Sequence, residues 1–202
     1  MMEIYLMDSE RSKEEFRIMK GYTPCYVYSG GQHYRVDIVS TERHFNEIQN
    51  EMERTKDHGN CAFLCSGEIL VPECSDDAVV AAVKEAAEEG VLPCFPQVSL
   101  IDWDKGERED AFLHANVTFP DGRMMNKHLL RYQGRLFSLV IEKRDRPATH
   151  FLLRNDHDDE GELRGIIDML AENGLFADFE PYYTIAMTEL RPFWKGSITE
   201  AG

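Results

Sequence analysis

The side chains best suited to chemistry lie in residues 123–154, where eight Lys and Arg residues stand beside two acidic ones. The segment therefore carries a formal charge of +6, eight minus two, in a chain whose net charge is −15. Guanidinium groups bind carboxylates and phosphates through paired hydrogen bonds, and imidazole transfers protons near neutral pH. These groups could bind an anionic ligand if they share one face; otherwise they are the solvated face of a half-covered sheet. The candidate ligand-binding residues are Arg131, Arg144, Arg146, His150 and Arg154.

A cluster of carboxylates follows directly and could contact a cationic partner. The sequence from Asp156 to Gly161 has oxygen ligands at alternate positions, as a calcium loop does, but its twelfth position is Ile167 and not a carboxylate. Acidic side chains also cap helix N-termini and interact favourably with the helix dipole, which explains this cluster better. We therefore expect no metal here. The candidate partner-binding residues are Asp156, Asp158, Asp159, Glu160, Glu162 and, near the C-terminus, the aromatic anchor Trp194.

The five cysteines offer a second and weaker metal option. Cys61 and Cys65 share one side of an expected strand, roughly 13 Å apart, whereas zinc usually takes two ligands from a tight turn. Small buried thiols, including Cys74, are the better interpretation, and the odd count favours reduced cysteines. The sequence also contains no recognisable hydrolase or nucleotide-binding motif. We expect neither a metal nor a cofactor.

Four helices are expected from their apolar spacing and their capping residues. The clearest begins after Ser75 and stops at Gly90, and another runs from about residue 158 to Gly174. A third helix begins near Thr41, and a weaker one follows the capping-box spacing at Ser12. The residues that these helices should bury are Val79, Ala82, Val83 and Ala86; Ile166, Ile167 and Leu170; and Phe45, Ile48 and Met52.

Strands are expected between the helices, mostly in antiparallel pairs. Gly30-Gly31 should join a tight hairpin, because glycine supplies the positive dihedral angles that such turns need. Residues 111–154 have the pattern of a meander that contains the basic segment, and a last strand is expected over residues 182–190. His128 and His150 fall on strands of this meander, where they could meet the arginines on one face.

The order of the expected elements predicts the fold class. Two strands bracket the clearest helix and form a β-α-β stretch near residues 61–103, so these strands could be parallel neighbours. The predicted fold is α+β: a largely antiparallel sheet with about four helices packed mainly on one side. The charged loop 104–110 could separate two halves, but either half alone would have a thin core. We therefore predict a single domain over residues 1–202.

The acidic composition limits the classes of partner. The chain has 37 Asp and Glu residues against 22 Lys and Arg, so we expect no binding to nucleic acid or to an anionic membrane. The apolar run at Met1–Met7 is too short for a signal peptide or a spanning helix, which favours a cytoplasmic protein.

Three functions remain, of which a metal-dependent regulator comes last because it rests only on the two imperfect metal patterns. The leading prediction is a non-enzymatic protein-interaction module, such as an inhibitor or immunity-type protein, that covers a basic partner with its carboxylates. The alternative is a small-molecule or nucleotide-binding enzyme that uses the basic, histidine-bearing residues 123–154. The sequence predicts no substrate and no oligomeric state.

Overall fold

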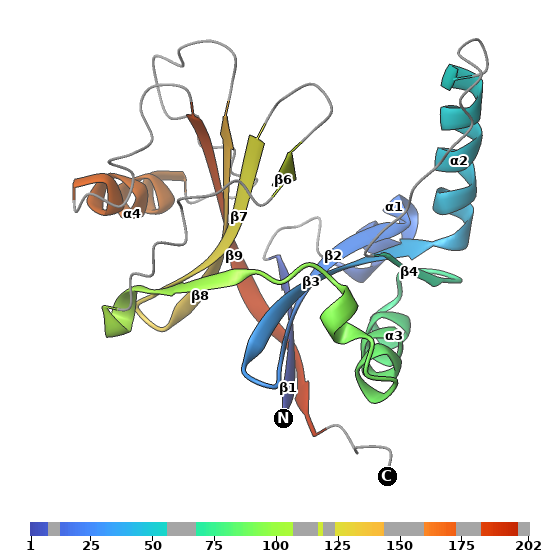
Figure 1. Cartoon of the computed structure of the whole chain (residues 1–202), viewed down its shortest axis with the longest axis horizontal. Helices are drawn as coiled ribbons and strands as arrows, with labels where there is room; N and C mark the ends of the chain where they lie inside the picture. Colours follow the sequence, from blue (N-terminus) through green and yellow to red (C-terminus); the bar gives the residue numbers. More distant parts are fainter. Residues whose placement is uncertain are drawn as a thin grey trace. The chain divides into compact units, whose positions relative to one another are not determined.

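The computed structural model describes residues 1–7, 13–55, 68–106, 117–118, 124–143, 160–172 and 183–197. These residues form four α-helices and nine strands, which Figure 1 shows along the chain. The fold divides into two compact units, Met1–Val98 with Arg191–Gly202, and Ser99–Leu190. Neither limit between the units falls in the charged loop 104–110. The single domain expected over residues 1–202 stays a prediction.

The first unit combines five strands with three α-helices. Its elements are β1 (Met2–Met7), α1 (Glu14–Lys20), β2 (Tyr22–Ser29), β3 (Gln32–Ser40), α2 (Thr41–Thr55), β4 (Glu68–Val71), α3 (Asp76–Glu88) and the last part of β9 (Tyr183–Gly196). The strands are hydrogen-bonded in the order β4-β3-β2-β1-β9. The pairs β1–β2 and β2–β3 are antiparallel, and β3–β4 is parallel. The predicted hairpin is confirmed, with Ser29 opposite Gln32 across Gly30-Gly31.

One face of this sheet is buried against α3. Alternate residues of β1, β2 and β3 point toward the helix, because successive side chains of a strand face opposite ways. The residues of β1, β2 and β3 in this hydrophobic cluster are Met2, Ile4, Leu6, Cys25, Val27, Tyr34, Val36 and Ile38. The helix contributes the predicted stripe, since Val79, Ala82, Val83 and Ala86 are all buried. The periodicity of α3 was therefore sufficient to predict which of its sides packs on the sheet.

The helix α2 forms where the sequence predicts it, but the expected burial of its apolar stripe is wrong. Phe45 is 58% exposed and Met52 is 51% exposed, while Ile48 is half-buried. Figure 1 shows α2 leaving the end of β3 and extending away from the strands of its unit. The described elements therefore do not cover this side of α2.

The second unit consists of strands and one long helix. Its elements are β5 (Ser99–Asp102), β6 (Val117–Thr118), β7 (Met124–Tyr132), β8 (Arg135–Lys143), α4 (Glu160–Glu172) and the first part of β9. The strands are ordered β9-β8-β7-β5, with β6 beside β7. The pair β5–β7 is parallel and the other described pairs are antiparallel. Ile166, Ile167 and Leu170 of α4 pack with Phe137 and Leu139 of β8, which confirms the predicted stripe of α4.

The expectation that the strands on either side of α3 are parallel neighbours is wrong. The strand β4 pairs in parallel with β3, and β5 pairs in parallel with β7. The parallel crossover of the first unit is instead β3-α2-β4, in which α2 connects two strands that are adjacent in the sheet. Sequence order alone did not distinguish these connections, because both consist of a strand, a helix and a strand.

One strand prediction changed in extent, and two other strands of the expected meander lie wholly or mostly outside the described residues. The last strand was expected over residues 182–190, but β9 continues to Gly196. The strand expected over residues 149–154 lies outside the described residues, as does most of the one over 111–119. The predicted α+β fold class, with a largely antiparallel sheet and about four helices, is confirmed.

Candidate functional site

Arg131 is the one predicted ligand-binding residue that falls within the described part of the chain. Its guanidinium Nη1 lies 3.1 Å from Oδ2 of Asp102, a carboxylate that is only 2% exposed. Lys105 Nζ lies 3.3 Å from the same carboxylate oxygen. Arg131 therefore compensates a buried negative charge in the second unit, and its contact with a ligand stays a prediction. The remaining candidates, Arg144, Arg146, His150 and Arg154, lie outside the described residues.

His128 does not share a face with Arg131. The two residues are three positions apart on β7, so their side chains point to opposite faces of the sheet. His128 is 2% exposed, and burial lowers its pKa to about 4. The imidazole is therefore neutral at pH 7, and the structure does not bring it together with Arg131 as one anion site.

Glu162 is the one predicted partner-binding carboxylate whose side chain is described. It forms an ion pair with Arg135, whose Nε also donates to Glu189 at 3.0 Å. These hydrogen bonds, first to Glu189 and then to Glu162, raise the pKa of Arg135. Glu162 thus helps to hold α4 against β8 and β9. Glu160 begins α4, and Asp156, Asp158 and Asp159 lie outside the described residues.

Trp194 is half-buried, although the sequence suggested an exposed anchor. It lies on β9, packed against the hydrophobic cluster of the first unit, and the Lys84 ammonium lies 5.7 Å from its ring centroid. A cation near an aromatic face is attracted by the electron density of the ring. Trp194 therefore joins β9 to α3, and its contact with a partner stays a prediction.

The best candidate for a contact surface is the C-terminal end of α3. Glu85, Glu88 and Glu89 are all exposed there, and we call these three residues the acidic end of α3. Glu88 and Glu89 follow Glu85 by three and four positions, a spacing that brings like charges together on a helix. The last turn of α3 contains no basic residue. Negative charge is unfavourable at this position, because the C-terminus of a helix carries the negative end of its dipole.

The rest of α3 holds this surface rigidly. Ser75 caps the helix, its hydroxyl accepting a hydrogen bond from the Ala78 N–H, and Asp76 and Asp77 occupy the first turn. The buried side of α3 fixes its rotation about its own axis. The acidic end is therefore presented to solvent in one orientation.

Three arginines of the same unit, in contrast, have carboxylate partners. Arg35 Nη2 lies 3.1 Å from Asp37, and Arg43 Nε lies 2.6 Å from Glu47. The buried Arg17 pairs with Asp76, next to Phe193. Glu85, Glu88 and Glu89 form no ion pair within the described residues, so this negative charge is not compensated there.

The acidic end of α3 is not among the contact residues predicted from the sequence, although its signal is present there. Residues 85–89 contain three glutamates and no basic residue. Because Val79, Ala82, Val83 and Ala86 mark the buried side, the glutamates could have been assigned to the remaining surface. The contact residues were instead predicted mainly within residues 123–162, where the contrast between basic and acidic segments is stronger.

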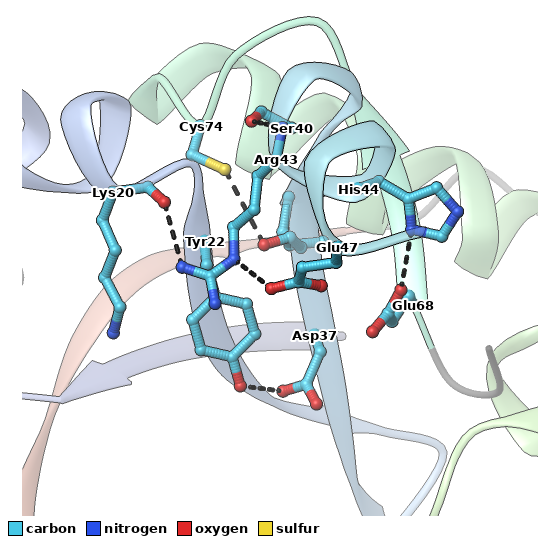
Figure 2. A network of polar contacts seen from close by, with 10 residues as sticks. Lys20, Tyr22, Asp37, Ser40, Arg43, His44, Glu47, Glu68 and Cys74 are labelled. Carbon is cyan, nitrogen blue, oxygen red and sulfur yellow. Dashed lines mark hydrogen bonds and ion pairs between the residues drawn. The ribbon is translucent and has the colours of Figure 1, made fainter. Parts of the chain in front are cut away.

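A polar network joins α1 and α2 to β2, β3 and β4 (Figure 2). The Tyr22 hydroxyl lies 3.2 Å from Asp37 Oδ1, and Arg43 lies over its ring, 5.2 Å from the centroid. Burial, followed by the charge of Asp37, raises the pKa of Tyr22 to about 12. Tyr22 is therefore a neutral hydrogen-bonding group at pH 7. The network positions α2 rather than forming a set of reactive groups.

The metal options of the sequence are not strengthened by the described residues. No group of three or more His, Cys, Asp or Glu is placed to hold a metal ion among them. Cys74 is buried, and burial raises the pKa of its thiol. Cys61 and Cys65 lie outside the described residues.

Comparison of the chain with protein-family models, curated proteins and solved structures found no match. None of the described helices combines the length and the apolar character that crossing a membrane requires.

Proposed function

We propose that this chain is a non-enzymatic interaction protein that binds a basic protein partner through the acidic end of α3. The observation that carries the proposal is the position of Glu85, Glu88 and Glu89 at the negative end of a helix dipole. Their mutual repulsion and the dipole both destabilise the free protein. A cationic partner removes both penalties on binding, so the arrangement favours complex formation.

The net charge of −15 supports the same proposal. A strongly negative molecule attracts cationic partners over distances comparable with the Debye length, and this raises the association rate. A contact of the carboxylates of residues 156–162, or of Trp194, with a basic partner stays a separate prediction of the sequence. The alternative is an enzyme that uses residues 123–154, and four of its five candidate residues, Arg144, Arg146, His150 and Arg154, lie outside the described residues. A cytoplasmic location likewise stays a prediction.

The proposal is tested by titrating the full chain with a peptide of about ten lysines at low ionic strength. The triple variant Glu85→Gln, Glu88→Gln, Glu89→Gln removes the acidic end of α3. A matched triple variant, Glu15→Gln, Asp168→Asn, Glu172→Gln, removes three other exposed carboxylates. We expect the first variant to bind the peptide about tenfold more weakly, and the second less than about threefold more weakly.

The comparison between the two variants decides the outcome. Both change the net charge by +3, so a general effect of acidity weakens binding equally in both. Equal losses would reject the acidic end of α3 as the contact surface.

A further inference from the structure

An apolar stripe on α2 is exposed although the helix belongs to a folded unit. Phe45 and Met52 are 58% and 51% exposed, and Ile48 lies between them on the same side, because the spacings of three and four residues place all three together. We call Phe45, Ile48 and Met52 the α2 stripe. Exposed apolar groups at this spacing are typical of surfaces that bind an amphipathic helix.

The stripe is held in place at the base of α2. The Ser40 hydroxyl accepts a hydrogen bond from the Arg43 N–H at 3.2 Å, and the Arg43 side chain donates to the Lys20 carbonyl at 3.1 Å. His44 Nδ1 lies 3.4 Å from Glu68 of β4. Figure 2 shows that Arg43 and His44 reach neighbouring elements from the first turns of α2. The stripe is therefore presented by an anchored helix.

The charges of α2 indicate the chemistry of its partner. Glu42 and Glu53 are exposed beside the stripe and form no ion pair among the described residues. Arg43 lies on the other side of the helix, where Glu47 and the Tyr22 ring already hold it. An approaching helix therefore meets apolar side chains bordered by negative charge.

We propose that the α2 stripe is a docking surface for an amphipathic helix of another protein, with lysine or arginine beside its apolar residues. Leucine or methionine side chains of that helix would cover Phe45, Ile48 and Met52, and its cations would lie near Glu42 and Glu53. This surface is on a different helix from the acidic end of α3. This docking surface adds a second contact to the proposed function. Binding there depends on the spacing of apolar residues in the partner and not on charge alone.

The test measures binding of the full chain to a labelled helical peptide of about 18 residues, with leucines at spacings of three and four and lysines beside them. A scrambled peptide of the same composition has the same charge but no stripe. We expect the amphipathic peptide to bind at least about tenfold more tightly than the scrambled one. The variant Phe45→Ser, Met52→Ser should abolish this preference without lowering the melting temperature.

Matched variants separate the stripe from exposed apolar surface in general. Met19→Ser with Val91→Ser changes two other exposed apolar residues, 77% and 41% exposed, and should keep the preference. Glu42→Lys with Glu53→Lys keeps the stripe but repels the lysines, so it should weaken binding of the amphipathic peptide about tenfold.

Three results would overturn the inference. A native chain that binds both peptides equally has no docking stripe, and the ten-lysine titration still judges the proposed function separately. A fall of several degrees in the melting temperature of Phe45→Ser, Met52→Ser would show that the chain itself covers the stripe. Concentration-dependent self-association that this variant abolishes would assign the stripe to a second copy of the chain.

Discussion

At the scale of single residues, burial decides which ionisable groups take part in surface electrostatics. Asp102 is buried but has Arg131 and Lys105 beside it, so its charge is compensated. His128 of the second unit is buried, and burial keeps it neutral at pH 7. The exposed glutamates of α3, by comparison, remain available to a partner.

Burial of His128 should make the protein sensitive to mild acid. Its folded pKa of about 4 lies below the 6.5 of an unperturbed histidine, so the unfolded state binds the proton more readily. The stabilisation is complete above pH 6.5 and is lost as the pH falls toward 4. Between pH 7 and pH 5 this histidine should account for a loss of about 2 kcal/mol in the free energy of unfolding.

Urea denaturation at the two pH values measures this loss. His128→Leu replaces the titrating group with an apolar side chain, so its free energy of unfolding should fall by about 2 kcal/mol less than that of the native protein over the same interval. If His128 contributes nothing, the free energies of unfolding of the native protein and of His128→Leu will fall by the same amount between pH 7 and pH 5.

At the scale of elements, the joint between α1 and β2 is tightly packed. Gly21 ends α1 with φ +65°, and its carbonyl accepts a hydrogen bond from the Ser40 N–H. A Cβ at Gly21 would lie 2.4 Å from Ser40 Oγ and 3.0 Å from Arg43 Cβ. This close approach is what allows Arg43, at the start of α2, to reach the Lys20 carbonyl.

Alanine at Gly21 should therefore destabilise the protein through two separate effects. Gly30 has φ +59°, and a Cβ added there would meet no atom within 4 Å, so it provides the control for backbone strain alone. We expect Gly30→Ala to lower the free energy of unfolding by about 1 kcal/mol, and Gly21→Ala by at least about 1 kcal/mol more. Equal losses in urea denaturation would contradict the close packing at this joint.

The acidic end of α3 should reduce the stability of its own helix. Neutralising Glu85, Glu88 and Glu89 as glutamines removes the unfavourable dipole interaction and the mutual repulsion, so the free energy of unfolding should rise by about 0.5–1 kcal/mol. The same variant binds the lysine peptide more weakly in our proposal. Thermal denaturation at low salt measures the change, and a destabilised variant would indicate that these carboxylates hold the fold instead.

At the scale of the whole molecule, the net charge of −15 is the feature that most affects association. Such a charge acts over a distance that salt shortens, to about 10 Å at 0.1 M ionic strength. It therefore changes how fast a cationic partner arrives more than how long it remains bound.

Binding of the ten-lysine peptide should therefore depend on salt mainly through its association rate. Raising NaCl from about 20 mM to about 300 mM should slow association at least about tenfold and change dissociation less than about threefold. Stopped-flow fluorescence with a labelled peptide measures both rates. A salt effect confined to dissociation would assign the affinity to short-range contacts.

Much of the candidate surface could have been predicted from sequence, because it depends on local periodicity. The stripe of Val79 and Val83 predicted the buried side of α3 and so left Glu85 and Glu88 for its surface. Less of the predicted basic ligand site could be placed from the sequence. Whether side chains of several strands share one face depends on how the strands are aligned with one another. On β7 alone, alternation was enough to separate His128 from Arg131.

The sequence by itself determined the helices, the hairpin at Gly30-Gly31 and the α+β class, because caps, turns and apolar periods act between residues close along the chain. The cap expected at Ser12 is an exception, since the N-cap of α1 is Lys13, without a side-chain hydrogen bond. Only the tertiary structure decided that β4 pairs with β3 and β5 with β7, because strand partners are chosen by contacts between distant segments. It also decided the environment of α2. An apolar stripe is equally compatible with a core and with a partner, and Phe45 and Met52 are exposed because the described strands of their unit lie elsewhere.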